Sequence, residues 1–278
     1  MKLAVAIAGN QALDSAFVVW RGFEESIRKA SEYGYHGVEL ALKNAEDVNA
    51  RDILRWLEKC NMEVSCITTG QVFAALGLYF TSPDANIRKK AIEIFSDLII
   101  LAKDFGGLIN IGRARGFVAA GQSRETAEKL FLETAEAICE TADLHKVLIL
   151  FEPVNRYEIN FINSLDEGAE LISKLKCNNA GLMPDIFHMN IEDDIIKNSL
   201  VRNASLLRYI HFADSNRLAP GWGHVDFKDV FDGLGEAGYD GWVSVEILPK
   251  PDPDSAARQA ARFLLPKIER YNKINTRR

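Results

Sequence analysis

The sequence predicts a single (β/α)8 barrel, on three observations. Eight short apolar runs typical of strands alternate with helix-like segments from one end of the 278-residue chain to the other. That length suits one such barrel, which normally takes about 250 residues. No proline-, glycine- or serine-rich linker, charge block or low-complexity tract interrupts the pattern, so we expect one domain over residues 1–278.

The predicted strands are short apolar runs bounded by turn residues or charges. The clearest lies in KVLILFEP, where five apolar residues from Val147 to Phe151 precede Glu152 and Pro153. A continuous apolar run of this kind is typical of a strand buried on both faces, as in a parallel sheet. We expect strands over residues 3–8, 36–41, 63–69, 107–112, 147–152, 180–185, 207–213 and 241–247.

The intervening segments have helical periodicity and residues that favour helix ends. Over residues 84–105, apolar side chains recur at three- and four-residue spacing. Ser82-Pro83 in front of them predicts an N-cap followed by a proline at the first helical position. Ser164, with Glu167 three residues later, predicts a capping box at the start of another helix.

A doubly wound open sheet is the alternative architecture. It would normally carry a glycine-rich phosphate-binding turn after the first strand, and the sequence AGNQ at residues 8–11 is not one. The barrel is therefore preferred, and its active site should lie at the C-terminal ends of the strands.

Composition restricts the class of protein and of partner. The net charge of −6 argues against nucleic acid as the main partner, because phosphate binding needs a basic surface. The four cysteines lack metal-binding spacing, so we expect reduced, mostly buried thiols. The apolar run at residues 3–9 suits a first strand better than a signal peptide, and no run approaches the roughly 18 residues of a membrane span. We therefore expect a cytoplasmic protein without a membrane partner.

Four potential metal ligands stand at the ends of four successive predicted strands: Glu152, Asp185, His211 and Glu246. Because neighbouring strand ends converge on the axis of a closed barrel, we expect these side chains to meet. Three carboxylates and one imidazole suit Mn²⁺, Mg²⁺ or Co²⁺ better than a thiolate-preferring metal. The structural alternative, in which strand-end acids only cap helices or face solvent, would have to hold for every member of the set.

Several segments of the sequence resemble those of a known family. The segments EPVNRYE, DIFHMN, HFADSNRLAPGWGHVDF and VSVEIL are similar to those of the xylose-isomerase-like sugar isomerases and epimerases. Within that superfamily they are most similar to ketose 3-epimerases of the tagatose/psicose type, especially 5-keto-L-gluconate epimerase. The resemblance covers the whole chain and implies a homo-oligomer, either a dimer or a tetramer.

The resemblance also implies roles for individual residues. Glu152, Asp185, His211 and Glu246 would bind one divalent ion, commonly Mn²⁺, and the two glutamates would double as the acid/base pair. The residues that would hold substrate oxygens are Glu158, His188 and Arg217.

Two arginines follow the predicted fourth strand, Arg113 and Arg115. Two guanidinium groups at a pocket mouth could bind a substrate carboxylate in bidentate fashion, or form a solvated pair beside the next helix.

The roles of two further residues stay open: Glu39 faces either the pocket or the barrel interior, and His224 either acts in the site or orders its loop. We expect the loops around Gly70-Gln71 and over residues 114–120 to cover the pocket.

The predicted reaction inverts the carbon next to the ketone of a keto-sugar or keto-sugar acid. The substrate would be of the 5-keto-L-gluconate to D-tagaturonate type, or a free ketose. A proton must leave one face and return to the other, so two opposed carboxylates can alternate as base and acid, each contributing on the order of 10²–10⁴-fold. A metal ion would stabilise the enediolate between the two steps.

Other activities keep the same site and change the chemistry. One alternative is an aldose–ketose or hydroxypyruvate isomerase, in which the proton moves between adjacent carbons on one face. Others are a dehydratase of the inosose type and a sugar-binding barrel without catalytic activity. A DNA endonuclease of this superfamily is disfavoured, because its three-zinc centre needs more histidines than this chain places near the site.

Overall fold

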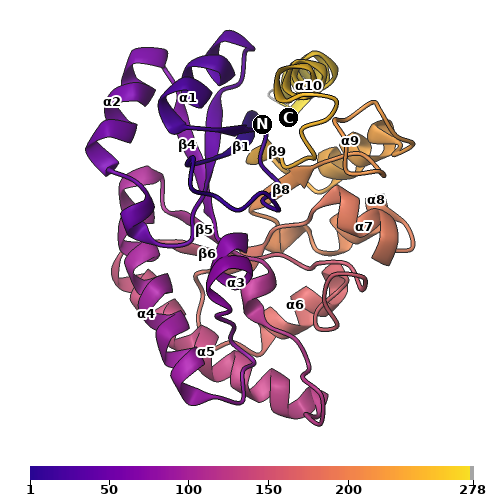
Figure 1. Cartoon of the computed structure of the whole chain (residues 1–278). Coiled ribbons are helices and arrows are strands. Elements are labelled where there is room, and N and C mark those ends of the chain that lie inside the picture. The colour runs from indigo at the N-terminus through magenta and orange to yellow at the C-terminus, as the bar shows by residue number, and fades with distance from the viewer. Residues whose placement is uncertain (276–278) are drawn as a thin grey trace.

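The computed structural model describes residues 1–275, in which eight parallel strands form a barrel surrounded by helices (Figure 1). The fold class predicted from the sequence is confirmed, and all eight predicted strands are present. They are β1 (Lys2–Ala8), β3 (Gly37–Ala41), β4 (Glu63–Thr68), β5 (Leu108–Ile111), β6 (Leu148–Phe151), β7 (Ala180–Leu182), β8 (Tyr209–Phe212) and β9 (Trp242–Val245).

The strands pair in the order β7-β6-β5-β4-β3-β1-β9-β8, and two isolated bridges nearly close the ring between β7 and β8. These bridges join Leu182 to Leu207 and Asp185 to His211. A two-residue strand that the sequence did not predict, β2 (Trp20–Arg21), pairs with β1 outside the ring. One of the two bridges that close the barrel therefore joins two of the candidate ligands, Asp185 and His211.

The strand β7 is shorter than the predicted 180–185 because Pro184 has no amide hydrogen for the ladder. The chain nevertheless continues along the barrel wall: the Met183 amide donates to the Phe151 carbonyl at 2.9 Å, and the His211 amide donates to the Pro184 carbonyl at 2.9 Å. This path delivers Asp185 to the same end of the barrel as the neighbouring strand ends.

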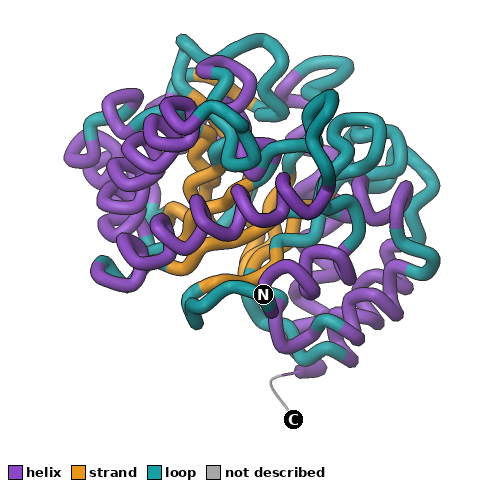
Figure 2. The backbone as a smooth tube through the Cα atoms, turned by 90° about the horizontal axis from the view of Figure 1, so that it is seen from below, coloured by secondary structure: helices purple, strands orange, loops and turns teal. Residues whose placement is uncertain are grey.

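Helices cover the outside of the barrel, which Figure 2 shows as purple tubes around the orange strands. None of the helices within residues 1–275 combines the length and apolar character needed to cross a membrane. The α-helices are α1 (Phe23–Glu32), α2 (Ala50–Cys60), α3 (Gly70–Leu76), α4 (Ala85–Ala102), α5 (Arg124–Leu144), α6 (Leu165–Ser173), α7 (Ile186–Glu192), α8 (Ile196–Arg202), α9 (Phe227–Glu236) and α10 (Pro253–Asn275). Short 3₁₀ turns are η1 (Ala45–Asp47), η2 (Lys103–Phe105), η3 (Arg113–Arg115) and η4 (Ala204–Leu206).

The start of α4 corrects one prediction. Its N-cap is Asp84, whose carboxylate accepts from the Asn86 amide at 2.8 Å, rather than Ser82. The Ser82 hydroxyl instead accepts from the Asp84 amide at 3.2 Å, which leaves Pro83 outside the helix. A charged carboxylate nearest the first helical amides caps them better than a hydroxyl two residues earlier.

The start of α6 matches its prediction in part. Ser164 is the N-cap and accepts from the Glu167 amide at 3.2 Å. The Glu167 carboxylate accepts from the Asn163 amide, one residue before the cap, so the reciprocal half of the capping box is displaced by one position.

The main hydrophobic core lies between the strands and the helices, and a smaller cluster fills the barrel interior. That inner cluster consists of Cys66, Leu150, Met183 and Tyr209. Successive side chains of a strand point to opposite faces, so the same strands supply both the outer core and this inner floor. The floor supports the residues at the strand ends.

Candidate active site

The four candidate ligands at the strand ends meet in the structure. Glu152 follows β6 directly, Glu246 follows β9, His211 belongs to β8, and Asp185 is the N-cap of α7. One ligand atom from each lies within 4.8 Å of those of the others. Three of the residues are buried and Glu246 is partly exposed, and the two glutamates of the cluster line a pocket open to solvent.

A hydrogen-bonded chain beneath the cluster fixes the imidazole of His211. Its Nε2 lies 2.9 Å from Glu39 Oε2, and its Nδ1 lies 3.1 Å from Glu152 Oε1. The hydroxyl of Tyr209 donates to the same Glu39 oxygen at 2.9 Å. Glu39 is fully buried, so of the two positions left open by the sequence it takes the barrel interior. It orients the ring, with Nδ1 directed toward the cluster.

The carboxyl groups of the cluster have strongly separated pKa values. Burial opposes ionisation of Glu152, but the hydrogen bond and charge of His211 lower its pKa to about 2. Burial raises the pKa of Asp185 to about 7 and that of Glu246 to about 8, against the opposing charges of Arg217 and His211. Burial disfavours charge on His211 too, yet Glu39, Glu246 and Glu152 raise its pKa well above the ordinary value. The cluster therefore has an excess of negative charge that protons partly neutralise.

The donor set fits a divalent cation. Asp185 Oδ1 accepts from the Phe187 amide at 2.8 Å, whereas its buried Oδ2 has no hydrogen-bond partner among residues 1–275. The ring nitrogen His188 Nε2 is 3.6 Å from that oxygen, which is too long for a hydrogen bond. An unpartnered buried carboxylate oxygen beside two more carboxyls and an imidazole is the arrangement that a hard divalent metal satisfies.

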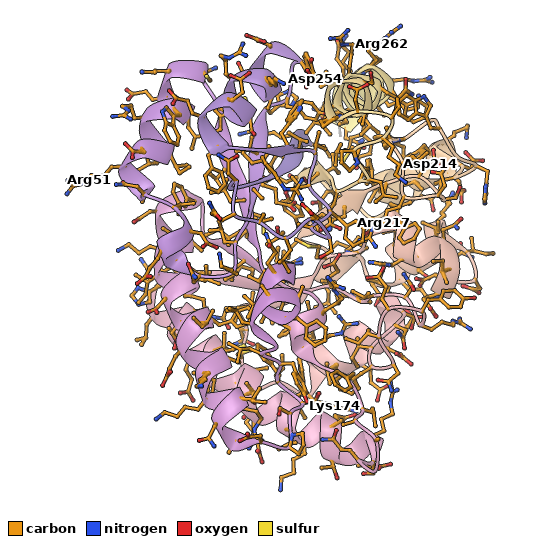
Figure 3. The ribbon with its side chains drawn as sticks, viewed as in Figure 1. Arg51, Lys174, Asp214, Arg217, Asp254 and Arg262 are labelled. Atoms are coloured by element: carbon orange, nitrogen blue, oxygen red, sulfur yellow. The ribbon has the colours of Figure 1, made fainter. Side chains whose placement is uncertain are left out.

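Arg217 spans the pocket above this cluster and is labelled in Figure 3. Its guanidinium donates to Glu158 at 2.6 Å and to Glu246 at 3.1 Å. It is stacked between two rings, 3.4 Å from the centroid of Phe17 and 4.9 Å from that of Phe187. The two carboxylates and two rings hold this buried cation in one position.

His188 and Glu158 also line the pocket, as expected from the sequence. The Asn155 amide nitrogen lies 2.7 Å from His188 Nδ1 and 3.3 Å from Glu158. Burial, reinforced by the charge of Arg217, lowers the pKa of His188 well below its ordinary value. A neutral imidazole at this place can either donate or accept a hydrogen bond.

The two arginines after β5 take different places. Arg113 lines the pocket, its guanidinium 5.9 Å from the Phe73 ring centroid, and within residues 1–275 it has no ion pair or side-chain hydrogen bond. Arg115 is fully buried and donates to the carbonyls of Phe161, Gly112 and Ile162 at 2.6–3.1 Å. The prediction that Arg115 binds substrate is wrong, because the 3₁₀ turn directs residues two apart to different sides.

Two other expectations about the rim are resolved. His224 is exposed and its Nδ1 lies 2.9 Å from the Ser215 hydroxyl, so it orders its loop and does not line the pocket. Gly70 and Gln71, at the start of α3, do line it. Beyond Arg113, the segment expected to cover the pocket packs elsewhere: Phe117 stacks on Tyr79 with ring centroids 4.7 Å apart.

Sequence reasoning missed three features of the site. Asn110 donates to Glu152 Oε2 at 2.8 Å, and its only signal was one amide inside an apolar strand. Gly112 approaches the same oxygen so closely that a Cβ there would lie 2.7 Å from it. Asp214, labelled in Figure 3, is buried and accepts from three loop amides, which fixes the loop that carries Arg217.

If His211 ligates a metal ion, replacement of Glu39 by glutamine is expected to weaken binding of Mn²⁺ by about 10- to 100-fold, because the partner that orients the His211 ring is changed. A titration of free Mn²⁺ by electron paramagnetic resonance would measure the effect. Ser65→Ala is the matched control, since Ser65 contacts the Tyr209 hydroxyl at 2.6 Å in the same interior but does not contact His211. Unchanged affinity in folded Glu39→Gln protein would contradict the orienting role.

Comparison with known proteins gives consistent results. A model of the family described as a xylose isomerase-like TIM barrel matches residues 27–267. The chain is 30% identical over 252 residues to the 3-dehydro-D-guloside 4-epimerase of Escherichia coli K12, covering 86% of this chain and 93% of the relative. It is 26% identical over 233 residues to the L-ribulose 3-epimerase of Mesorhizobium japonicum, covering 80% and 74%.

Solved structures share the fold. The apo crystal structure of the 3-keto-D-glucoside 4-epimerase from E. coli matches with a TM-score of 0.81 at 21% identity. The match covers 96% of this chain and 99% of that chain.

Proposed function

Because the chain belongs to the xylose isomerase-like TIM barrel family, among its carbohydrate epimerases, we propose that it inverts the carbon next to a ketone with the help of a divalent metal ion. The substrate is a keto-sugar or keto-sugar acid, of the 5-keto-L-gluconate to D-tagaturonate type or a free ketose. By their names, one relative inverts C3 of a ketose and the other C4 of a 3-dehydro sugar. In both, the inverted carbon adjoins a carbonyl.

One observation supports the proposal: two carboxyl groups belong to a single cluster that could hold a cation, and they come from different sides of the barrel. Glu152 and Glu246 follow β6 and β9, which are three strands apart around the ring of eight. Two groups so placed approach a substrate from different sides. One carboxylate can then remove the proton from one face while the other returns a proton to the opposite face, and the roles exchange for the reverse direction.

The cation is assigned to Glu152, Asp185, His211 and Glu246, with Mn²⁺ as the proposed ion. When bound, a divalent ion would polarise the carbonyl and stabilise the charge of the enediolate, worth several kcal/mol.

The chain's own residues position the two carboxyls. The Asn110 amide donates to Glu152 Oε2, and Arg217 donates to Glu246 Oε2. Each contact limits the rotation of its carboxyl group, so the lone pairs that are not used in the contact keep fixed directions. The separated pKa values of the pair, about 2 and about 8 without a cation, suit one ionised and one protonated partner.

Substrate hydroxyls are assigned to the polar groups above the cluster. Glu158 accepts hydrogen bonds, Arg217 donates them, and neutral His188 can do either. All three line the pocket and are held in place before a ligand arrives. Arg217 donates to Glu158, and the Asn155 amide contacts both Glu158 and His188.

Arg113 is assigned to the carboxylate of a keto-sugar acid. Arg113→Gln is expected to raise the KM for 5-keto-L-gluconate by about 10- to 100-fold, because a charged hydrogen bond is lost. The KM for D-psicose, which has no carboxylate, should change little. Initial rates on both substrates measure the difference, and Arg51→Gln, at the outer edge of α2 in Figure 3, is the matched control. An equal rise for both substrates would remove Arg113 from carboxylate recognition.

The activity is tested with metal-stripped protein in D₂O, with and without Mn²⁺. The substrates are 5-keto-L-gluconate, D-tagatose, D-psicose, D-fructose and hydroxypyruvate, followed by nuclear magnetic resonance. Mn²⁺-dependent deuteration next to the ketone, with inversion, is the expected result. Migration of the carbonyl would instead establish an isomerase on the same ligands. No exchange on any of these compounds would overturn the substrate class.

A further inference from the structure

Two cysteines far apart in the sequence meet on the outside of the barrel. Cys139 lies on α5 and Cys177 lies between α6 and β7, 38 positions later, with their sulfur atoms 2.8 Å apart. All four cysteines are free thiols, and the other two lie elsewhere: Cys60 at the end of α2 and Cys66 in β4.

The segment that carries Cys177 is held firmly against α5. The Asn179 side-chain amide donates to the Cys139 carbonyl at 2.9 Å, and the Asn179 carbonyl accepts from the Ile149 amide of β6 at 2.9 Å. These hydrogen bonds fix the backbone near both cysteines, so the two sulfur atoms are held close to each other.

The pair differs in exposure and in acidity. Cys139 is buried, whereas Cys177 is partly exposed in a surface hollow whose charged border is Glu136, Glu140, Asp143 and Lys176. The contact between the two sulfurs lowers the pKa of Cys177 and raises that of Cys139, and burial of Cys139 acts in the same direction on its own pKa. The accessible sulfur thus has more thiolate character, and the buried sulfur is placed directly behind it. With three carboxylates and one lysine, the border has a net negative charge and favours a small neutral oxidant over an anionic one.

We propose that Cys139 and Cys177 form a reversible disulfide when the protein meets a hydroperoxide. The Cys177 thiolate attacks the terminal oxygen of the hydroperoxide, the O–O bond breaks, and an alkoxide leaves (hydroxide when the oxidant is hydrogen peroxide), so that Cys177 becomes a sulfenic acid. The Cys139 thiol then attacks the Cys177 sulfur. The S–S bond forms, the S–O bond breaks, and the departing hydroxide takes the Cys139 proton as water. The two sulfurs together lose two electrons, which reduce one hydroperoxide.

The disulfide is expected to stabilise the fold without changing turnover. It would link α5 to the entry of β7, at the end of that strand opposite Asp185 and the pocket. Closing a loop of 38 positions restricts the unfolded chain, which should raise the Tm by roughly 5 °C. The kcat should remain that of the reduced protein.

The experiment treats the whole protein with a small excess of hydrogen peroxide and counts thiols in denaturant. Titratable thiols should fall from four to two, and peptide mapping should find Cys139 joined to Cys177. Dithiothreitol should restore all four thiols and the lower Tm. In Cys177→Ser, peroxide should neither shift the Tm nor cross-link Cys139, whereas Cys60→Ser should behave as the parent does.

The proposal is overturned if all four thiols persist, if Cys177 accumulates as a sulfinic acid without a cross-link, or if the cross-link joins another pair. The peptide map of the unmutated protein decides among these outcomes even if a variant does not fold. None of them depends on the substrate, so failure here leaves the proposed epimerase activity untouched.

Discussion

Glu246→Gln is expected to slow epimerisation by about 10²–10⁴-fold, because the amide can neither take nor return the proton on its side of the substrate. Glu152→Gln should have an effect of similar size from the opposite side. Each variant should still exchange with D₂O the proton of the epimer that faces its remaining carboxylate. Nuclear magnetic resonance should then show deuteration without inversion. The two variants should deuterate opposite epimers, which is the result expected of a two-base mechanism.

The two glutamates are also assigned as ligands, so the bound Mn²⁺ of each variant must be measured alongside its rate. Glu24→Gln, an exposed change on α1, is the matched control for the loss of one carboxylate. If the variants keep their metal and their rate, Glu152 and Glu246 are not the acid/base pair. A barrel that only binds sugars predicts retained ligand affinity and no turnover even in the unmutated protein.

Removal of divalent metal is expected to abolish turnover, since the carbonyl then lacks the charge that stabilises the enediolate. Added Mn²⁺ should restore it, and Asp185→Asn should need far more Mn²⁺ for the same rate, because it replaces the carboxylate whose Oδ2 has no hydrogen-bond partner within the described chain. Exposed Asp252→Asn, in the turn before α10, is the control. Equal Mn²⁺ requirements for Asp185→Asn and the parent would place the ion elsewhere.

Metal affinity should also depend on pH in a defined direction. In the protein without a cation, burial raises the pKa of Asp185 to about 7 and that of Glu246 to about 8. A ligating carboxyl must lose its proton, so affinity should rise with pH up to about 8, by about tenfold per pH unit for each proton displaced. The raised pKa of His211, whose ligating nitrogen must also lose a proton, extends the rise beyond that pH. Calorimetry in buffers of different ionisation enthalpy counts the released protons. Affinity that falls with rising pH over this window would contradict the assigned protonation.

The sequence predicted the barrel and the place of its four potential ligands because both depend on a simple pattern. When each of several buried strands ends in a polar residue and the strands form a closed barrel, those residues must lie together at the C-terminal end of the barrel. The role of Glu39 stayed open because position alone does not say which polar side chain of a strand faces inward to a partner. That partner is His211, 172 positions away.

The fate of the arginines after β5 could not be predicted for a different reason. Arg113 and Arg115 carry the same charge and stand two residues apart, and the short turn η3 decides which of them reaches the pocket. The choice is made by carbonyl groups of residues 161 and 162, whose position depends on a loop after another strand. Such contacts between distant segments leave no local signal in the sequence.

That buried guanidinium has a consequence for how the specificity of the enzyme can change. Arg115 connects the turn after β5 to the loop after β6, so this half of the rim supports the fold. Substitution of Arg115 would lower the stability of the fold before it altered substrate selectivity. Ser15, Ala74 and Arg113 also border the pocket, but their side chains do not carry this network. Natural divergence and directed evolution toward new sugars should therefore proceed through those three positions, with Arg115 left unchanged.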